Sequence, residues 1–141
     1  MADIAMQIDV AGEPKAILEA LTSTDGVAGW WTTRNETSGT PGAINRYWFP
    51  GMESTHDMRV IRADEDAVEW ECVGGPPQWI GTRVRWTLMP GRDGGTVVLL
   101  DHTGFPAVDT MYRIVTVGWV QMILRLKEHV ETGKPVPYFS F

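Results

Sequence analysis

Few residues in this sequence are of the types that perform chemistry, and they lie far apart along the chain. The 141 residues include three histidines and one cysteine. His102 lies in an alternating strand pattern and is expected to face the interior. Because an imidazole titrates near neutral pH, His102 would donate or accept a proton at a bound carbonyl or hydroxyl group. The alternative is a core histidine bonded to backbone or water, as buried polar groups normally are.

The other soft donors show no arrangement that indicates a metal or a nucleophile. Cys72 is expected to face inward, where a thiol is inert. Together with His56 and His129 it has no zinc-ligand spacing such as Cys-x-x-Cys or His-Glu-x-x-His. The chain also lacks a Gly-x-Ser-x-Gly elbow and a phosphate-binding glycine loop. We therefore predict no metal and no cofactor, and His102 is the one candidate catalytic residue.

Tryptophan is the abundant residue that needs an explanation. Seven tryptophans, four phenylalanines and three tyrosines must either fill a thick core or line a cavity. Trp30 and Trp31 are expected to close one end of such a cavity, with at least one of them in the core. Tyr47, Trp48 and Phe49 are consecutive, so alternation does not decide which of them faces inward.

Composition restricts the classes of function. A net charge of −6 and a pI near 4.9 argue against nucleic-acid binding, which depends on clustered Lys and Arg. The N-terminus lacks the pattern of a signal peptide, and the longest charge-free apolar run, Ile114–Leu124, is too short to span a membrane. A single cysteine fits a reducing compartment. We expect one soluble cytoplasmic domain covering residues 1–141.

The elements that must position these residues are six strands and three helices. A long helix is expected from Asp109 to Thr132, capped by Asp109 and ended by Gly133. Two short helices precede it, one opening at Pro14 and one ending near Trp30, and a loop covers Thr32–Pro41. Alternation and turn signals predict strands at Asp3–Ala11, Ala43–Phe49, His56–Ala63, Ala67–Val73, Gly81–Met89 and Thr96–Thr103. The fold class is α+β, with an antiparallel sheet because the breaks between strands are short.

Charge fixes the strand register. Pairing Glu69 with Arg85 and Glu71 with Arg83 places opposite charges across two strands, and Arg85 then pairs with Asp101. These residues form one wet face, interpreted as a lattice of solvated ion pairs rather than a catalytic cluster. The opposite face is apolar.

The long helix must cover that apolar face. Its apolar stripe contains Met111, Val115, Gly118, Trp119, Met122, Leu126 and Val130. A strongly twisted sheet cannot touch a straight helix everywhere, and Gly118 leaves a gap, so we expect a cavity between them. The alternative is a plain core. The residues expected to line the cavity and bind a ligand are Met58, Trp70, Val84, Trp86, His102, Gly118, Trp119 and Met122.

The outer side of the same helix is less polar than a solvated surface should be. Val117, Val120 and Leu124 lie together there and would form a dimer or partner surface. The alternative is that the short helices cover them or that they are simply exposed.

Short motifs in a fixed order resemble a known family. They are Pro14 with Ala20-Leu21-Thr22, Gly29-Trp30-Trp31, Trp79 through Val84, Gly95-Thr96, Asp101 through Phe105, Gly118-Trp119 with Leu124, and Glu131 through Pro135. This order resembles the activator-of-Hsp90-ATPase-homologue-like (AHSA-like) branch of the START and birch-pollen-allergen-like (SRPBCC) superfamily. The resemblance covers nearly the whole chain and implies a helix-grip fold.

The resemblance implies an apolar ligand, such as a lipid, a sterol or a polyketide-like molecule, held between sheet and helix. We predict binding of a small hydrophobic or aromatic ligand, without catalysis. One alternative is a small cyclase or hydrolase that uses the same cavity with His102 as acid or base. Another is a protein-interaction module linked to a chaperone and to stress response. The sequence has no second, N-terminal activator domain, so full co-chaperone activity is not expected.

Overall fold

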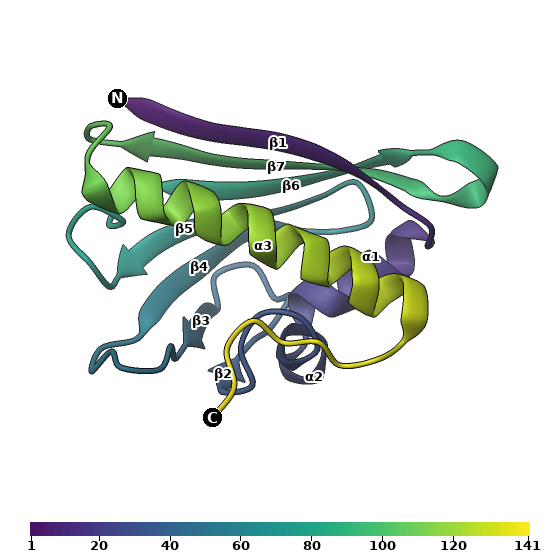
Figure 1. Ribbon diagram of the computed structural model, residues 1–141, viewed down its shortest axis with the longest axis horizontal. Helices are drawn as coiled ribbons and strands as arrows, with labels where there is room; N and C mark the ends of the chain where they lie inside the picture. The colour runs from purple at the N-terminus through teal and green to yellow at the C-terminus, as the bar shows by residue number, and fades with distance from the viewer.

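A computed structural model describes residues 1–141 as one sheet of seven strands with three helices (Figure 1). The elements in chain order are β1 (Ala2–Val10), α1 (Pro14–Thr22), α2 (Thr24–Ala28), β2 (Asn35–Glu36), β3 (Ile44–Tyr47), β4 (His56–Ala63), β5 (Ala67–Gly74), β6 (Arg83–Pro90), β7 (Thr96–Phe105) and α3 (Thr110–Thr132). A single 3₁₀ turn at Arg92–Gly94 joins β6 to β7.

The sheet is antiparallel, with strand order β1-β7-β6-β5-β4-β3-β2. The registers predicted from charge are confirmed. Glu69 pairs with Arg85 between β5 and β6, and Arg85 pairs with Asp101 between β6 and β7. Met58 pairs with Cys72 between β4 and β5. Because side chains alternate between faces, these pairs fix which residues point toward α3.

The predicted count of six strands is wrong by one. β2, which has only two residues, lies within the segment Thr32–Pro41 that was predicted to be a loop. Two residues are too few to show an alternating pattern. The buried Asn35 side chain fixes the strand by donating to the carbonyls of Thr24 and Thr32, each at 3.1 Å. The overall architecture remains an α+β fold with a curved antiparallel sheet and a long C-terminal helix, as in the helix-grip fold.

The outer face of the sheet carries two of the expected ion pairs, Glu69–Arg85 and Glu71–Arg83, while Arg85 and Asp101 pair in strand register without an ion pair. Glu69 lies 3.4 Å from Arg85 and 3.6 Å from Arg83, and Arg59 lies 3.3 Å from Glu71. The arginines are about half exposed, so these pairs contribute little to stability.

α3 crosses the opposite face of the sheet (Figure 1). The Asp109 side chain accepts a hydrogen bond from the Tyr112 amide, and Gly133 ends the helix in the left-handed conformation at φ 73°. The helix buries five apolar side chains against the sheet and the core: Val115, Trp119, Met122, Ile123 and Leu126. None of the three helices combines the length and the hydropathy needed to cross a bilayer.

Candidate functional site

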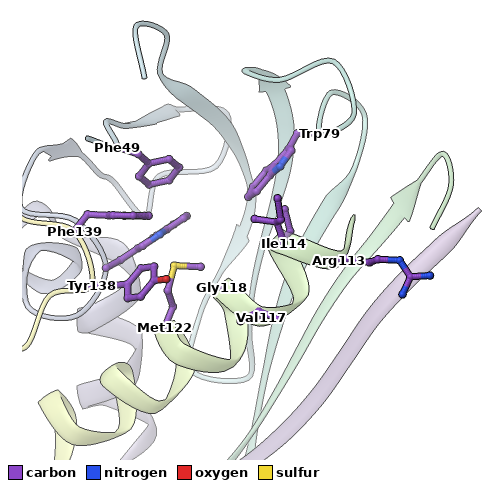
Figure 2. A pocket seen from close by; sticks show the side chains of 11 residues that line it. Phe49, Trp79, Arg113, Ile114, Val117, Gly118, Met122, Tyr138 and Phe139 are labelled. Atoms are coloured by element: carbon purple, nitrogen blue, oxygen red, sulfur yellow. The ribbon is translucent and has the colours of Figure 1, made fainter. Parts of the chain in front are cut away.

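An apolar cleft opens beside α3, and we call it the aromatic cleft (Figure 2). It encloses about 480 Å³, which lies within the ~300–1,000 Å³ typical of small-molecule sites. Nine of its eleven lining residues are hydrophobic. The lining residues are Trp31, Phe49, Trp79, Arg113, Ile114, Val115, Val117, Gly118, Met122, Tyr138 and Phe139.

Gly118 keeps the helix side of the cleft open. A Cβ atom built at this position would meet one atom within 4 Å, Met122 Cε at 3.9 Å. Glycine in a helix interior costs roughly 1 kcal/mol relative to alanine. Here that cost coincides with empty space, since Figure 2 shows Gly118 between Ile114 on one side and Met122 on the other.

The walls of the cleft are aromatic rings that hold one another in place. Phe49 packs on Phe139 with ring centres 4.7 Å apart, and it packs on His56 at 4.4 Å. The His56 ring in turn meets Trp79 edge to face at 4.7 Å. His56 thus links Phe49 and Trp79, which lie on opposite sides of the opening in Figure 2.

The C-terminal segment after α3 supplies one wall. The amides of Val136 and Phe139 donate to the carbonyls of Gly29 and Trp31, each at 2.8 Å. Arg125 on α3 donates to two carbonyls of the same segment, those of Val136 and Pro137, at 2.9 Å. These bonds hold the rings of Tyr138 and Phe139 over the core next to Trp31.

Of the eight residues predicted to bind a ligand, the structure places two on the cleft, Gly118 and Met122. The other six have exposed fractions of 0% and lie in the packed core beneath α3. The rings of Trp86 and Trp119 are 5.7 Å apart, and those of Trp70 and Trp86 are 6.2 Å apart, so the indoles touch one another there. The six core residues are Met58, Trp70, Val84, Trp86, His102 and Trp119.

The His102 ring has a hydrogen-bond partner at each nitrogen. Trp119 Nε1–H donates to His102 Nδ1 at 2.9 Å, so the proton of the neutral ring is on Nε2. Nε2 donates to Thr82 Oγ1 at 2.9 Å, and the Thr82 hydroxyl donates to the carbonyl of Trp79 at 2.6 Å. Burial lowers the pKa of His102 to about 3. This arrangement is that of a core histidine, and it leaves neither nitrogen free to face the cleft.

His56 and Cys72 are also buried and uncharged at neutral pH. Burial lowers the pKa of His56 to about 4, although Asp57 opposes the shift. Burial raises the pKa of the Cys72 thiol to about 11, and Sγ lies 3.3 Å from the carbonyl of Gly74. No three His, Cys, Asp or Glu side chains lie close enough together to hold a metal ion.

Four residues that the sequence left undecided or overlooked lie on the cleft: Phe49, Trp79, Tyr138 and Phe139. Tyr47 and Phe49 face inward while Trp48 is half-buried, because alternation continues past the end of β3. Trp79 follows a Gly-Gly-Pro-Pro turn, where no periodicity shows that its ring is buried. Tyr138 and Phe139 follow Pro137 in a terminal segment. The one available signal was three aromatic residues in the last four, which is unusual for a solvated tail.

Comparison with known proteins identifies the family. A family model described as "Activator of Hsp90 ATPase homolog 1-like protein" matches residues 12–131. The chain belongs to this AHSA1 family. A search of curated proteins found no match.

Solved structures similar to this AHSA1 chain include three that cover 90% or more of it. The solution structure of the Aha1 dimer from Colwellia psychrerythraea has a TM-score of 0.85 and 27% identity, covering 95% of this chain and 99% of its own. DynU16, from the dynemicin biosynthetic locus, has a TM-score of 0.78 and 26% identity over 99% of this chain. This chain covers 51% of DynU16. MLL2253 from Mesorhizobium loti (TM-score 0.77, 19% identity, 90% and 95% coverage) shares the fold.

Proposed function

We propose that this AHSA1-family chain binds a small, mostly apolar molecule with an aromatic or fused-ring skeleton in the aromatic cleft. The observation that carries the proposal is the cleft itself, open at Gly118 and walled by aromatic rings. Membership of a family whose relatives often hold hydrophobic ligands supports it. DynU16, a similar structure from the dynemicin biosynthetic locus, also supports a small-molecule ligand.

The shape and chemistry of the walls favour a ring system. Phe49, Trp79 and Phe139 offer faces and edges on which a flat aromatic molecule would stack, while the fully buried Trp31 packs against Phe49. Met122 offers a flexible thioether that adapts to irregular shapes. Arg113 is the one charged lining residue, and Figure 2 shows its guanidinium turned away from the rings. The bound molecule is therefore expected to place any acidic group at the rim and its apolar body inside.

Fluorescence titration with N-phenyl-1-naphthylamine, a neutral aromatic probe, tests the proposal. Saturable enhancement of probe emission at one site per chain is expected, together with quenching of tryptophan emission. Native mass spectrometry of protein purified from its own host would then show whether a molecule stays bound. A probe signal that rises linearly without saturation, and a native mass equal to the chain alone, would refute ligand binding.

The exposed side of α3 supports a second proposal, self-association. Val117, Val120 and Leu124 are 46–59% exposed. The Colwellia psychrerythraea relative, which this chain covers almost completely, is described as a dimer. We propose that this chain also forms a homodimer, through these α3 residues. Sedimentation of Leu124→Glu tests this: the wild type should show a concentration-dependent dimer and the variant a monomer. Equal monomer masses for both proteins would refute it.

A further inference from the structure

The outer face of α3 carries a pattern that is complementary to itself. Arg113, Val117, Val120, Gln121, Leu124 and Glu128 are all exposed, and we call them the α3 outer face. At 100° per residue they fall within one third of the helix circumference, opposite the buried stripe that contains Trp119. Apart from Gln121, the face is apolar in its middle, and it carries one charge of each sign at its ends.

Two copies of this face match when the helices run antiparallel about a two-fold axis. With the axis between Val120 and Gln121, each residue lies opposite the residue of the second copy whose number adds with its own to 241. Val117 then faces Leu124 of the second copy, and Arg113 faces Glu128 of the second copy. The two-fold axis repeats each pair, so the interface has four apolar partners in its centre and an ion pair at each end.

The charges distinguish this register from the one in which the numbers sum to 237. Neither Arg113 nor Glu128 has an ion-pair partner within its own chain. They are 15 positions apart on one helix, about 22 Å at 1.5 Å per residue, so they cannot pair with each other. A shift by one turn, to a sum of 237, would place Arg113 opposite Leu124 and leave both charges without a partner.

We infer that the partner of the α3 outer face is a second copy of this chain, held antiparallel by two Arg113–Glu128 pairs. The inference specifies the geometry of the proposed homodimer and rests on that proposal. It also relates the dimer to the cleft, because Arg113 and Val117 line the cleft on its α3 side. The second copy therefore brings its Leu124 and Glu128 to the rim of the first copy's cleft.

Charge reversal tests the pairing directly in the unliganded protein. Arg113→Glu alone creates two Glu–Glu contacts, and Glu128→Arg alone creates two Arg–Arg contacts. Each single variant is expected to weaken dimerisation about tenfold, the effect of turning two rim ion pairs from attraction to repulsion. The double variant restores opposite charges and should dimerise within about threefold of the wild type. Arg113 and Glu128 are both exposed, so folding is not at risk.

Sedimentation equilibrium over a concentration series separates the outcomes. Weaker dimers for both single variants and recovery in the double variant would support the antiparallel pairing. The pairing would be overturned, with self-association left in place, if both single variants dimerise as tightly as the wild type. The same holds if the double variant dimerises more weakly than either single variant. A wild type that stays monomeric would overturn both. None of these outcomes depends on ligand binding, because the protein is measured without ligand.

Discussion

Replacing Gly118 by leucine separates ligand binding from stability, because the two are expected to change in opposite directions. The glycine lies in the interior of α3 and gives the helix no side-chain contact. Most substitutions at a binding site reduce both stability and binding, so a loss of binding alone would prove little. A leucine variant that is more stable and binds less, beside an alanine variant that is more stable and still binds, indicates filled space.

The magnitudes follow from the local geometry. Leucine has a helix propensity roughly 0.8 kcal/mol more favourable than glycine, and the nearest atom to the new Cβ, Met122 Cε, is 3.9 Å away. The free energy of unfolding should therefore rise by ~0.5–1 kcal/mol, which raises the Tm by roughly 2–4 °C for a chain of this size. The leucine methyl groups would occupy the floor of the cleft. Probe affinity should fall more than tenfold, or at least ~1.4 kcal/mol.

Thermal unfolding and N-phenyl-1-naphthylamine titration of the same preparations provide the assay. Gly118→Ala is the matched control, since its single methyl group gives the same gain in helix propensity while leaving most of the cleft empty. The control should be stabilised and should bind the probe within about threefold of the wild type. If Gly118→Leu binds as well as the control, the ligand does not use this cleft.

Further predictions concern the walls and the buried histidines. Phe139→Ala removes a ring that packs on Phe49 at 4.7 Å, and probe titration should show about tenfold weaker binding, as expected for a lost aromatic contact of ~1.4 kcal/mol. Thr82→Val removes the acceptor for His102 Nε2, so denaturant unfolding should show a loss of ~1–3 kcal/mol while probe affinity stays unchanged. His56 and His102 have pKa values lowered to about 4 and about 3, so the unfolded chain binds more protons than the folded chain below pH ~6.5. Stability should fall as the pH drops from ~6.5 to 4, by about 3 kcal/mol for each histidine; stability that stays constant over this range would refute the burial of both rings.

The elements and registers of this fold could be predicted because they depend on local sequence signals. Opposite charges at Glu69 and Arg85 select one register out of several, and side-chain alternation then assigns every residue of those strands to a face. Asp109 and Gly133 mark the ends of α3 by backbone chemistry that needs no tertiary contact. β2 escaped prediction because its two residues are held by the side chain of Asn35 rather than by a repeating pattern.

The position of the cleft depends on contacts between distant segments. For this reason the local sequence patterns predicted a cavity beneath α3, whereas the cleft lies beside the helix. Alternation correctly directs Trp70 and Trp86 inward, but it does not say whether two inward rings meet or leave a space. The structure has them in contact, and the open volume lies beside the helix. Its outer wall, the segment with Tyr138 and Phe139, is held by hydrogen bonds to residues more than 100 positions earlier, such as the bond from the Phe139 amide to the carbonyl of Trp31 at 2.8 Å. No local pattern encodes such a contact.

The indole signals in a two-dimensional ¹H–¹⁵N spectrum test the central claim most directly. Each of the seven tryptophans contributes one Nε1–H signal, and replacing them one at a time by phenylalanine assigns the signals. On addition of N-phenyl-1-naphthylamine, the signal of Trp79, which is on the wall of the cleft, should move most and should saturate. Those of Trp70 and Trp86, packed beneath α3, should move least. Large shifts at Trp70 and Trp86 with none at Trp79 would contradict the account, because the ligand would then lie in the core and not in the aromatic cleft.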